Sequence, residues 1–227
     1  MLNRTLIATS FLLIFAITIL HGQTEYLPKK RYNAYRVDVA PDIDGAFDDP
    51  AWQQGEWASG FVQFEPSEGK PPSQQTEFKL AFDDTNLYLA IRALDNAPDS
   101  INNRMSRRDN GDGDMVFVIF DSYHDLRTGF CFGVSSAGVR SDFIFSNNGE
   151  NEDPTWDPIW QAKSMIHAWG WGAEMKIPFT QLRFKKNAAE VWGFEVARQI
   201  FRHNEMSLWH PIPRTAPGVI HAMGELD

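Results

Sequence analysis

Four tryptophans beside polar loops are the residues of this sequence best suited to bind a sugar. A sugar ring has an apolar face of C–H groups and a rim of hydroxyls, so binding requires an exposed aromatic ring and polar partners that replace water. Arg108 and Asn148, in two long polar loops, are the candidate partners. The candidate rings are Trp156, Trp160, Trp169 and Trp209. Core packing is the alternative for each ring, and for any one tryptophan it is the more frequent outcome.

A second candidate site is the acidic loop that holds Asp109, Asp112 and Asp114. Calcium prefers carboxylate, amide and carbonyl oxygens, and such a loop could supply them to a structural ion. The loop is not an EF-hand, because Phe120 stands where the closing glutamate would be. A solvated acidic loop without metal is the other interpretation, and both stay open here.

Glu174 and Glu195 are the carboxylates that could perform glycoside hydrolysis, which needs two such groups about 5–10 Å apart in a cleft. Both lie in apolar strands, where pairing with Arg92, Lys176 or Arg198 explains them better. The sequence contains no nucleophile elbow, zinc-protease motif or phosphate loop, and its six histidines lack metal-ligand spacing. We therefore expect no catalytic role.

The elements that position these residues are short strands. Phe78, Leu80 and Phe82 alternate with Glu77, Lys79 and Ala81, which marks one buried face. A tight connection at 83–86 leads to a second alternating run at 87–93, and the pair predicts an antiparallel hairpin. Met115–Phe120 is apolar on both faces, which predicts a central strand of a sheet that is covered on both sides. About ten such strands, with turns every 8–12 residues and short helical turns, predict an all-β antiparallel sandwich.

Several of these segments resemble the family 9 carbohydrate-binding modules. Pro41–Trp52, Pro-Asp-Ile-Asp-Gly-Ala-Phe-Asp-Asp-Pro-Ala-Trp, is similar to the opening of that family, and Trp52 is expected to fold back as a buried plug. The other segments, in chain order, are 78–90, 114–121, 170–178, 192–195 and 224–226. The resemblance implies a jelly-roll-like β-sandwich over residues 35–227 and carbohydrate as its ligand.

The residues that hold the sugar in characterised members of this family are not found here. Those members clamp a sugar between two tryptophans, one before the central strand and one before the closing strand. The corresponding segments, 108–113 and 217–222, contain no aromatic residue. Either other aromatic residues bind the sugar, or the chain is a docking domain of an outer-membrane assembly that has kept only the fold.

The composition and the first residues indicate where the protein works. Residues 1–22 have the charged start and apolar run of a signal peptide, and 23–34 are expected to form a linker. The 227-residue chain has a net charge of −9 and no basic tract, which argues against a nucleic-acid partner. We expect a periplasmic, outer-membrane-associated or secreted module that binds carbohydrate without catalysis, alongside a partner or fused enzyme that hydrolyses polysaccharide.

Overall fold

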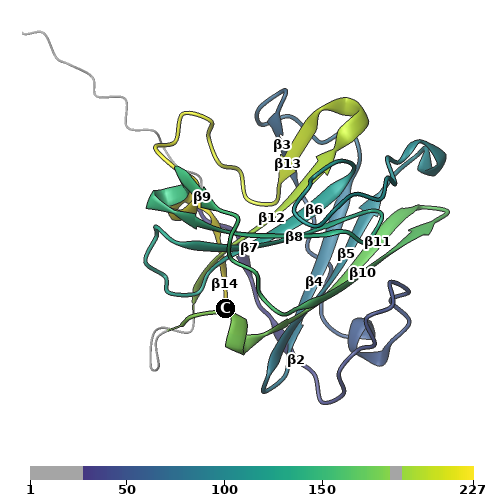
Figure 1. Ribbon diagram of the computed structural model, residues 1–227, viewed down its shortest axis with the longest axis horizontal. Helices are drawn as coiled ribbons and strands as arrows, with labels where there is room; N and C mark the ends of the chain where they lie inside the picture. The colour runs from purple at the N-terminus through teal and green to yellow at the C-terminus, as the bar shows by residue number, and fades with distance from the viewer. Residues whose placement is uncertain (1–27, 185–190) are drawn as a thin grey trace, which may run out of the picture.

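The computed structural model describes residues 28–184 and 191–227, and these form two β-sheets joined by loops and short 3₁₀ turns (Figure 1). The predicted signal peptide and residues 23–27 of the predicted linker lie outside the described residues. The first sheet contains β1 (Arg31–Tyr32), β3 (Val62–Glu65), β6 (Met115–Asp121), β7 (Gly129–Ser135), β8 (Arg140–Ser146), β9 (Asn151–Asp153), β12 (Trp192–Ile200), β13 (Glu205–Leu208) and β14 (Gly224–Leu226). The second contains β2 (Tyr35–Arg36), β4 (Thr76–Phe82), β5 (Asn86–Leu94), β10 (Gln161–His167) and β11 (Gly170–Pro178).

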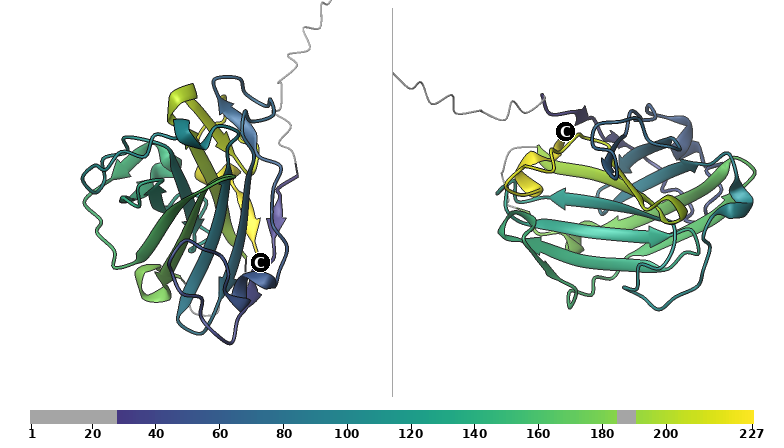
Figure 2. Two further views of the ribbon diagram at one scale, coloured as in Figure 1. Left: turned by 90° about the vertical axis from the view of Figure 1, so that its right-hand side faces the viewer. Right: turned by 90° about the horizontal axis from the view of Figure 1, so that it is seen from above.

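The two sheets pack face to face, which confirms the predicted β-sandwich (Figure 2). The nine-stranded sheet runs β1-β14-β12-β6-β7-β8-β9. Beyond the residues of β12 that pair with β14, β13 pairs with the second half of β12, and β3 pairs with β13. The five-stranded sheet runs β10-β11-β5-β4-β2. All pairings are antiparallel except those of the two-residue strands β1 and β2. The described strands outnumber the predicted ten because β1, β9 and β14 are too short to show an alternation of apolar and polar residues in the sequence.

The core lies between the inner faces of the two sheets, where alternate residues of each strand interdigitate. Phe78 and Leu80 of β4 lie opposite Leu89 and Ile91 of the predicted hairpin partner, and all four side chains are fully buried. Two tryptophans enclose this layer, each with its ring edge-on to a phenylalanine. The centroids of Phe132 and Trp160, and of Phe78 and Trp209, are both 5.3 Å apart.

The loop before β3 is fixed to the outer face of the five-stranded sheet by one buried carboxylate. Glu174 of β11 accepts hydrogen bonds from the backbone of Asp44 and Gly45 and from Nε1 of Trp52, at 2.9, 2.6 and 2.6 Å. Gly45 turns the chain there with φ of +93°, where other residues would be strained. Trp52, in the 3₁₀ turn η1 (Pro50–Gln53), is the buried plug that the sequence predicted.

The remaining 3₁₀ turns are η2 (Pro98–Ser100), η3 (Asn147–Gly149), η4 (Phe179–Gln181), η5 (Phe201–His203) and η6 (Ile220–Ala222). Residues 31–34 belong to the sandwich and not to a linker, because β1 pairs with β14 and Ala34 donates to the carbonyl of Asp227. In the described part of the chain, no helix has the length and apolar character that a membrane crossing requires.

Candidate ligand-binding groove

The outer face of the nine-stranded sheet is hollowed because small residues flank a phenylalanine. Ala197 of β12, Phe117 of β6 and Gly133 of β7 form one row across the sheet. A Cβ atom on Gly133 would stand 2.6 Å from the Phe117 ring, so glycine is what lets the ring cover this position. In the next row, Cys131 pairs with Phe143 of β8. Phenylalanine side chains and small residues thus lie side by side on this outer face.

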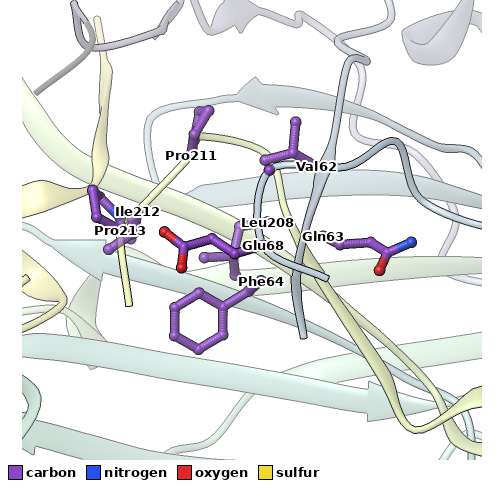
Figure 3. A pocket seen from close by; sticks show the side chains of 9 residues that line it. Val62, Gln63, Phe64, Glu68, Leu208, Pro211, Ile212 and Pro213 are labelled. Atoms are coloured by element: carbon purple, nitrogen blue, oxygen red, sulfur yellow. The ribbon is translucent and has the colours of Figure 1, made fainter. Parts of the chain in front are cut away.

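This depression, the outer-face groove, has two connected parts. The first, the sheet part, has a volume of about 240 Å³ and lies over the sheet, and the second, the loop part, has a volume of about 270 Å³ and lies between β3 with the turn that follows it and the loop after β13 (Figure 3). The described residues that line the sheet part alone are Phe117, Ile119, Cys131, Phe143, Phe145, Glu152, Ala197, Gln199, Met206 and Val219. The residues that line the loop part alone are Val62, Gln63, Glu68, Gly69, Pro211 and Pro213, and those that line both are Phe64, Leu208 and Ile212.

Two loops form the walls of the groove, and each is held by a polar side chain. Glu68 lies across the loop part and accepts a hydrogen bond from the backbone of Arg214 (Figure 3). The backbone carbonyl of Asn148 accepts a hydrogen bond from the backbone N–H of Val219 at 2.9 Å. The side-chain oxygen of Asn148 accepts another from the backbone N–H of His221 at 3.0 Å. Asn148 was predicted as a sugar partner, and the structure gives it the role of positioning Val219.

The groove is predominantly apolar. Phe143 and Phe145 are half-buried and meet edge-on, with ring centroids 4.9 Å apart. Burial raises the pKa of the Cys131 thiol well above its usual value, so this side chain behaves as a small apolar group. Among the described residues that line the sheet part, Glu152 and Gln199 are the two with side-chain oxygen or nitrogen atoms. The surface therefore suits C–H groups and offers few hydrogen bonds.

Two of the predicted sugar-binding tryptophans are core residues. Trp160 is 2% exposed and Trp209 is 3% exposed, so neither ring has a free face for a ligand. Trp160 donates Nε1–H to Asp142, and Trp209 packs on Phe78 and Phe194. Their prediction as exposed platforms was wrong, because the neighbouring loops that suggested exposure lie at the ends of strands that point these rings inward.

The other two predicted tryptophans are half-buried and lie away from the groove. Trp156 packs against Phe130 and Phe132, whose rings belong to the core between the sheets. Trp169 stacks on His167, with centroids 4.5 Å apart, beside Phe47 on the outer face of the five-stranded sheet. The four tryptophans therefore do not converge on one site.

Arg108 holds loops together. Its guanidinium donates to both oxygens of buried Asp142, at 2.7 and 2.8 Å, and pairs with Asp157 at 2.5 Å. A bidentate pair of this kind is a strong, directional contact. It fixes the acidic loop and the loop before β10 against β8, so the structure assigns Arg108 a structural role.

The predicted calcium ligands do not form one cluster. Asp109 accepts from the backbone of Asp142, Asp112 pairs with Arg104, and buried Asp114 accepts from the backbone of Phe201. Within residues 28–184 and 191–227, no group of three or more acidic, histidine or cysteine side chains could hold a metal ion. Calcium binding by this protein stays a prediction that no observation here tests.

Glu174 and Glu195 lie on opposite sides of the sandwich. Glu174 faces outward from the five-stranded sheet, where it holds the loop of Trp52. Glu195 faces outward from the nine-stranded sheet, where it accepts from the backbone of His210 and Val196 at 2.9 and 3.1 Å. The two carboxylates therefore cannot act on one glycosidic bond. The predicted pairing with arginine or lysine was also wrong, since backbone and indole N–H groups are their hydrogen-bond donors.

Glu195 belongs to a buried polar cluster under the loop after β13. Complete burial raises the pKa of Glu195 to about 8, because the charged form loses its water. His210 accepts a hydrogen bond at Nδ1 from the backbone of Lys30, and burial lowers its pKa to about 4. Lys30 also donates Nζ–H to the carbonyl of Trp209. The cluster ties the first strand to the wall of the groove.

The family to which the chain belongs is defined by a match over most of its length. Residues 43–205 match the description "Carbohydrate family 9 binding domain-like". The chain is a member of this family, as the sequence segments above suggested. A comparison with curated proteins returns no match.

Solved structures with the same fold include family 9 carbohydrate-binding modules. Two are structures of a module from Caldicellulosiruptor kristjanssonii, in complex with glucose (19% identity, TM-score 0.62, covering 87% of this chain and 95% of that chain) and with cellotriose (18% identity, TM-score 0.62, covering 87% and 93%). A third is a protein from Bacteroides uniformis (15% identity, TM-score 0.64, covering 88% and 99%). At these identities the similarity establishes the shared sandwich fold.

Proposed function

We propose that this protein binds carbohydrate without catalysis and that the outer-face groove is the binding site. The observation that carries the proposal is the cluster of phenylalanines that lines the groove, Phe117, Phe143 and Phe145. Aromatic side chains suit the apolar C–H face of a sugar. Membership of a carbohydrate-binding family supports this function.

The position of the groove also supports the proposal. The resemblance places one sugar-clamping tryptophan of the family in segment 217–222, and Val219 of this segment lines the groove. The related module from Caldicellulosiruptor binds glucose and cellotriose. Here phenylalanines of the sheet itself take the place of the missing tryptophan rings.

The setting that we propose is an exported module that works with polysaccharide-processing enzymes. The signal-peptide pattern of residues 1–22 and the acidic net charge of −9 support export and a neutral, non-nucleic-acid ligand. Hydrolysis of O-glycosyl compounds would belong to a partner or fused enzyme. The alternative, an outer-membrane docking domain without a sugar ligand, is favoured by the shortage of polar groups in the groove.

Replacing Phe143 by alanine is expected to weaken sugar binding about tenfold, since truncating a central aromatic contact of an interface commonly costs more than 1 kcal/mol. Isothermal titration of the wild-type chain with glucose, cellotriose and a panel of neutral oligosaccharides measures the reference affinity. Phe201→Ala is the matched control, because Phe201 is 39% exposed in η5 and is not among the residues that line the groove. An unchanged affinity of Phe143→Ala for the sugar would show that the sugar binds outside the outer-face groove. No heat with any glycan, together with capture of an envelope protein, would favour the docking alternative.

A further inference from the structure

The chemistry of the groove restricts which sugars it can accept. A free pyranose carries a hydroxyl on most of its ring carbons, and each hydroxyl taken from water needs a replacement partner. Among the described residues that line the sheet part of the groove, Glu152 and Gln199 alone have side-chain oxygen or nitrogen atoms. The backbone groups of β6 and β7 are already paired within the sheet. An unmodified sugar would therefore lose more hydrogen bonds on entry than it gains.

A sugar whose hydroxyls are capped by a small apolar group fits this surface better. Capping removes the hydroxyl donor that lacks a partner and adds a methyl group that can be buried on the ring of Phe117. Ala197, directly opposite Phe117 on the neighbouring strand, has only a methyl side chain and leaves room beside this ring. Each buried methyl-sized group adds to affinity, because apolar area is removed from water.

The two polar side chains define which cap is suitable. Gln199 is half-buried, and its amide N–H groups have no hydrogen-bond partner among the described residues. An ester carbonyl is an acceptor that this amide could satisfy, whereas a deoxy carbon has no acceptor and a methyl ether keeps only its more hindered ether oxygen. Glu152, a carboxylate that only accepts, suits a hydroxyl that is left uncapped.

The charge of the groove argues for a neutral ligand. The charged side chains that line its two parts are Glu68 and Glu152, both acidic. Arg214, beside the groove, pairs with Glu65 at 3.3 Å and covers the ring of Phe64. Uronic acids and sulfated sugars would therefore be repelled by these carboxylates, and the nearby Arg214 is already paired.

We propose that the outer-face groove selects O-acetylated sugar units, with the acetyl methyl on the ring of Phe117 and the ester carbonyl accepting from Gln199. This inference rests on the proposed function and specifies the ligand of the same site. It predicts that the protein distinguishes a decorated glycan from the same glycan after its esters are removed.

The test uses one ligand preparation in two forms. Acetylated xylo-oligosaccharides are titrated into the full chain by calorimetry, and the same preparation is titrated after mild alkaline deacetylation. We expect the acetylated form to bind about tenfold more tightly or more, the range by which one small apolar group is discriminated in a hydrophobic pocket. Gln199→Leu keeps the size of the side chain and is expected to remove most of that preference. Gln53→Leu, an exposed glutamine in η1 on the other sheet, is the matched control and should leave the preference unchanged.

The outcomes separate this inference from the proposed function. Equal affinity for both forms, or tighter binding of the deacetylated form, would overturn the acetyl preference and leave sugar binding in place. A preference that survives in Gln199→Leu would overturn the assigned role of the amide. Absence of binding to either form would contradict both proposals. Thermal melting of each variant establishes that a lost signal reflects the site and not the fold.

Discussion

Replacing Glu174 by alanine is expected to lower the free energy of unfolding by about 3–5 kcal/mol, the largest single-residue effect that we predict. The substitution leaves three donors without their acceptor, namely the backbone N–H groups of Asp44 and Gly45 and Nε1–H of Trp52. An unsatisfied buried donor costs about 1–3 kcal/mol. Because Trp52 is 3% exposed, its indole has little access to water as a substitute.

Urea denaturation measures this effect, and the melting temperature should fall by about 10 °C for a chain of this size. Glu77→Ala is the matched control, since Glu77 is half-buried on the same outer face and has no hydrogen-bond partner in the described part of the chain. Glu77→Ala should change the stability by less than about 0.5 kcal/mol, as surface substitutions usually do. Similar losses in both variants would show that Glu174 does not anchor the opening loop.

The second large effect is a loss of stability at alkaline pH that depends on Glu195. The folded state raises the pKa of Glu195 to about 8 from an ordinary value near 4.5. A group with a raised folded pKa contributes stability that is complete below the unfolded pKa and is lost as the pH rises through the folded pKa. The fully buried carboxylate must then ionise, and from pH 6 to pH 9 the expected loss is roughly 2–3 kcal/mol.

Glu195→Gln tests this pH dependence. The amide keeps an oxygen that can accept from the backbone of His210 and Val196, but it has no proton to lose. The difference in unfolding free energy between the variant and the wild type should therefore grow in favour of the variant from pH 6 to pH 9. The difference isolates Glu195 from every other titrating group. A constant difference over that range would show that Glu195 does not titrate there.

His210 is expected to produce the opposite slope at acid pH. Its folded pKa, lowered to about 4 from 6.5, means that its contribution is complete above pH 6.5 and is lost as the pH falls through 4. The main physical cause is burial, which takes water from the protonated imidazole, and the nearby charge of Lys30 lowers the pKa further. His210→Gln should flatten the unfolding free energy between pH 6.5 and pH 4, measured by urea denaturation. A slope that is the same in wild type and variant would assign the acid loss to other groups.

The sandwich could be predicted from sequence because its strands carry strong, local patterns. The alternation in 78–82 and 87–93 has only one arrangement that buries every apolar residue, and β4 and β5 adopt it. The opening segment was recognisable for the same reason, since the turn residues and Trp52 stand together in one short stretch. In the structure both are held by one distant carboxylate. Which carboxylate, Glu174, could not be read from sequence, because the contact spans more than a hundred residues.

The candidate site was missed for a physical reason. A tryptophan beside a polar loop can point to solvent or to the core, and only packing decides between the two, as Trp160 and Trp209 show. The groove instead comes from Phe117, Phe143 and Phe145, on the face of the sheet that is turned away from the core. The sequence did contain the signal, since β6 is apolar on both faces, but that pattern also describes a strand covered by other elements. In the structure, loops cover only part of the outer face of β6.

The measurement that tests the central claim most directly is amide chemical-shift mapping by NMR, with the tightest-binding oligosaccharide of the panel added to the wild-type chain. The proposal predicts that the largest shift changes gather on the outer face of the nine-stranded sheet, at Phe117, Phe143, Ala197 and Gln199. Changes that centre on Trp169 and Trp57, on the opposite outer face, or around Trp156 between the sheets, would contradict it.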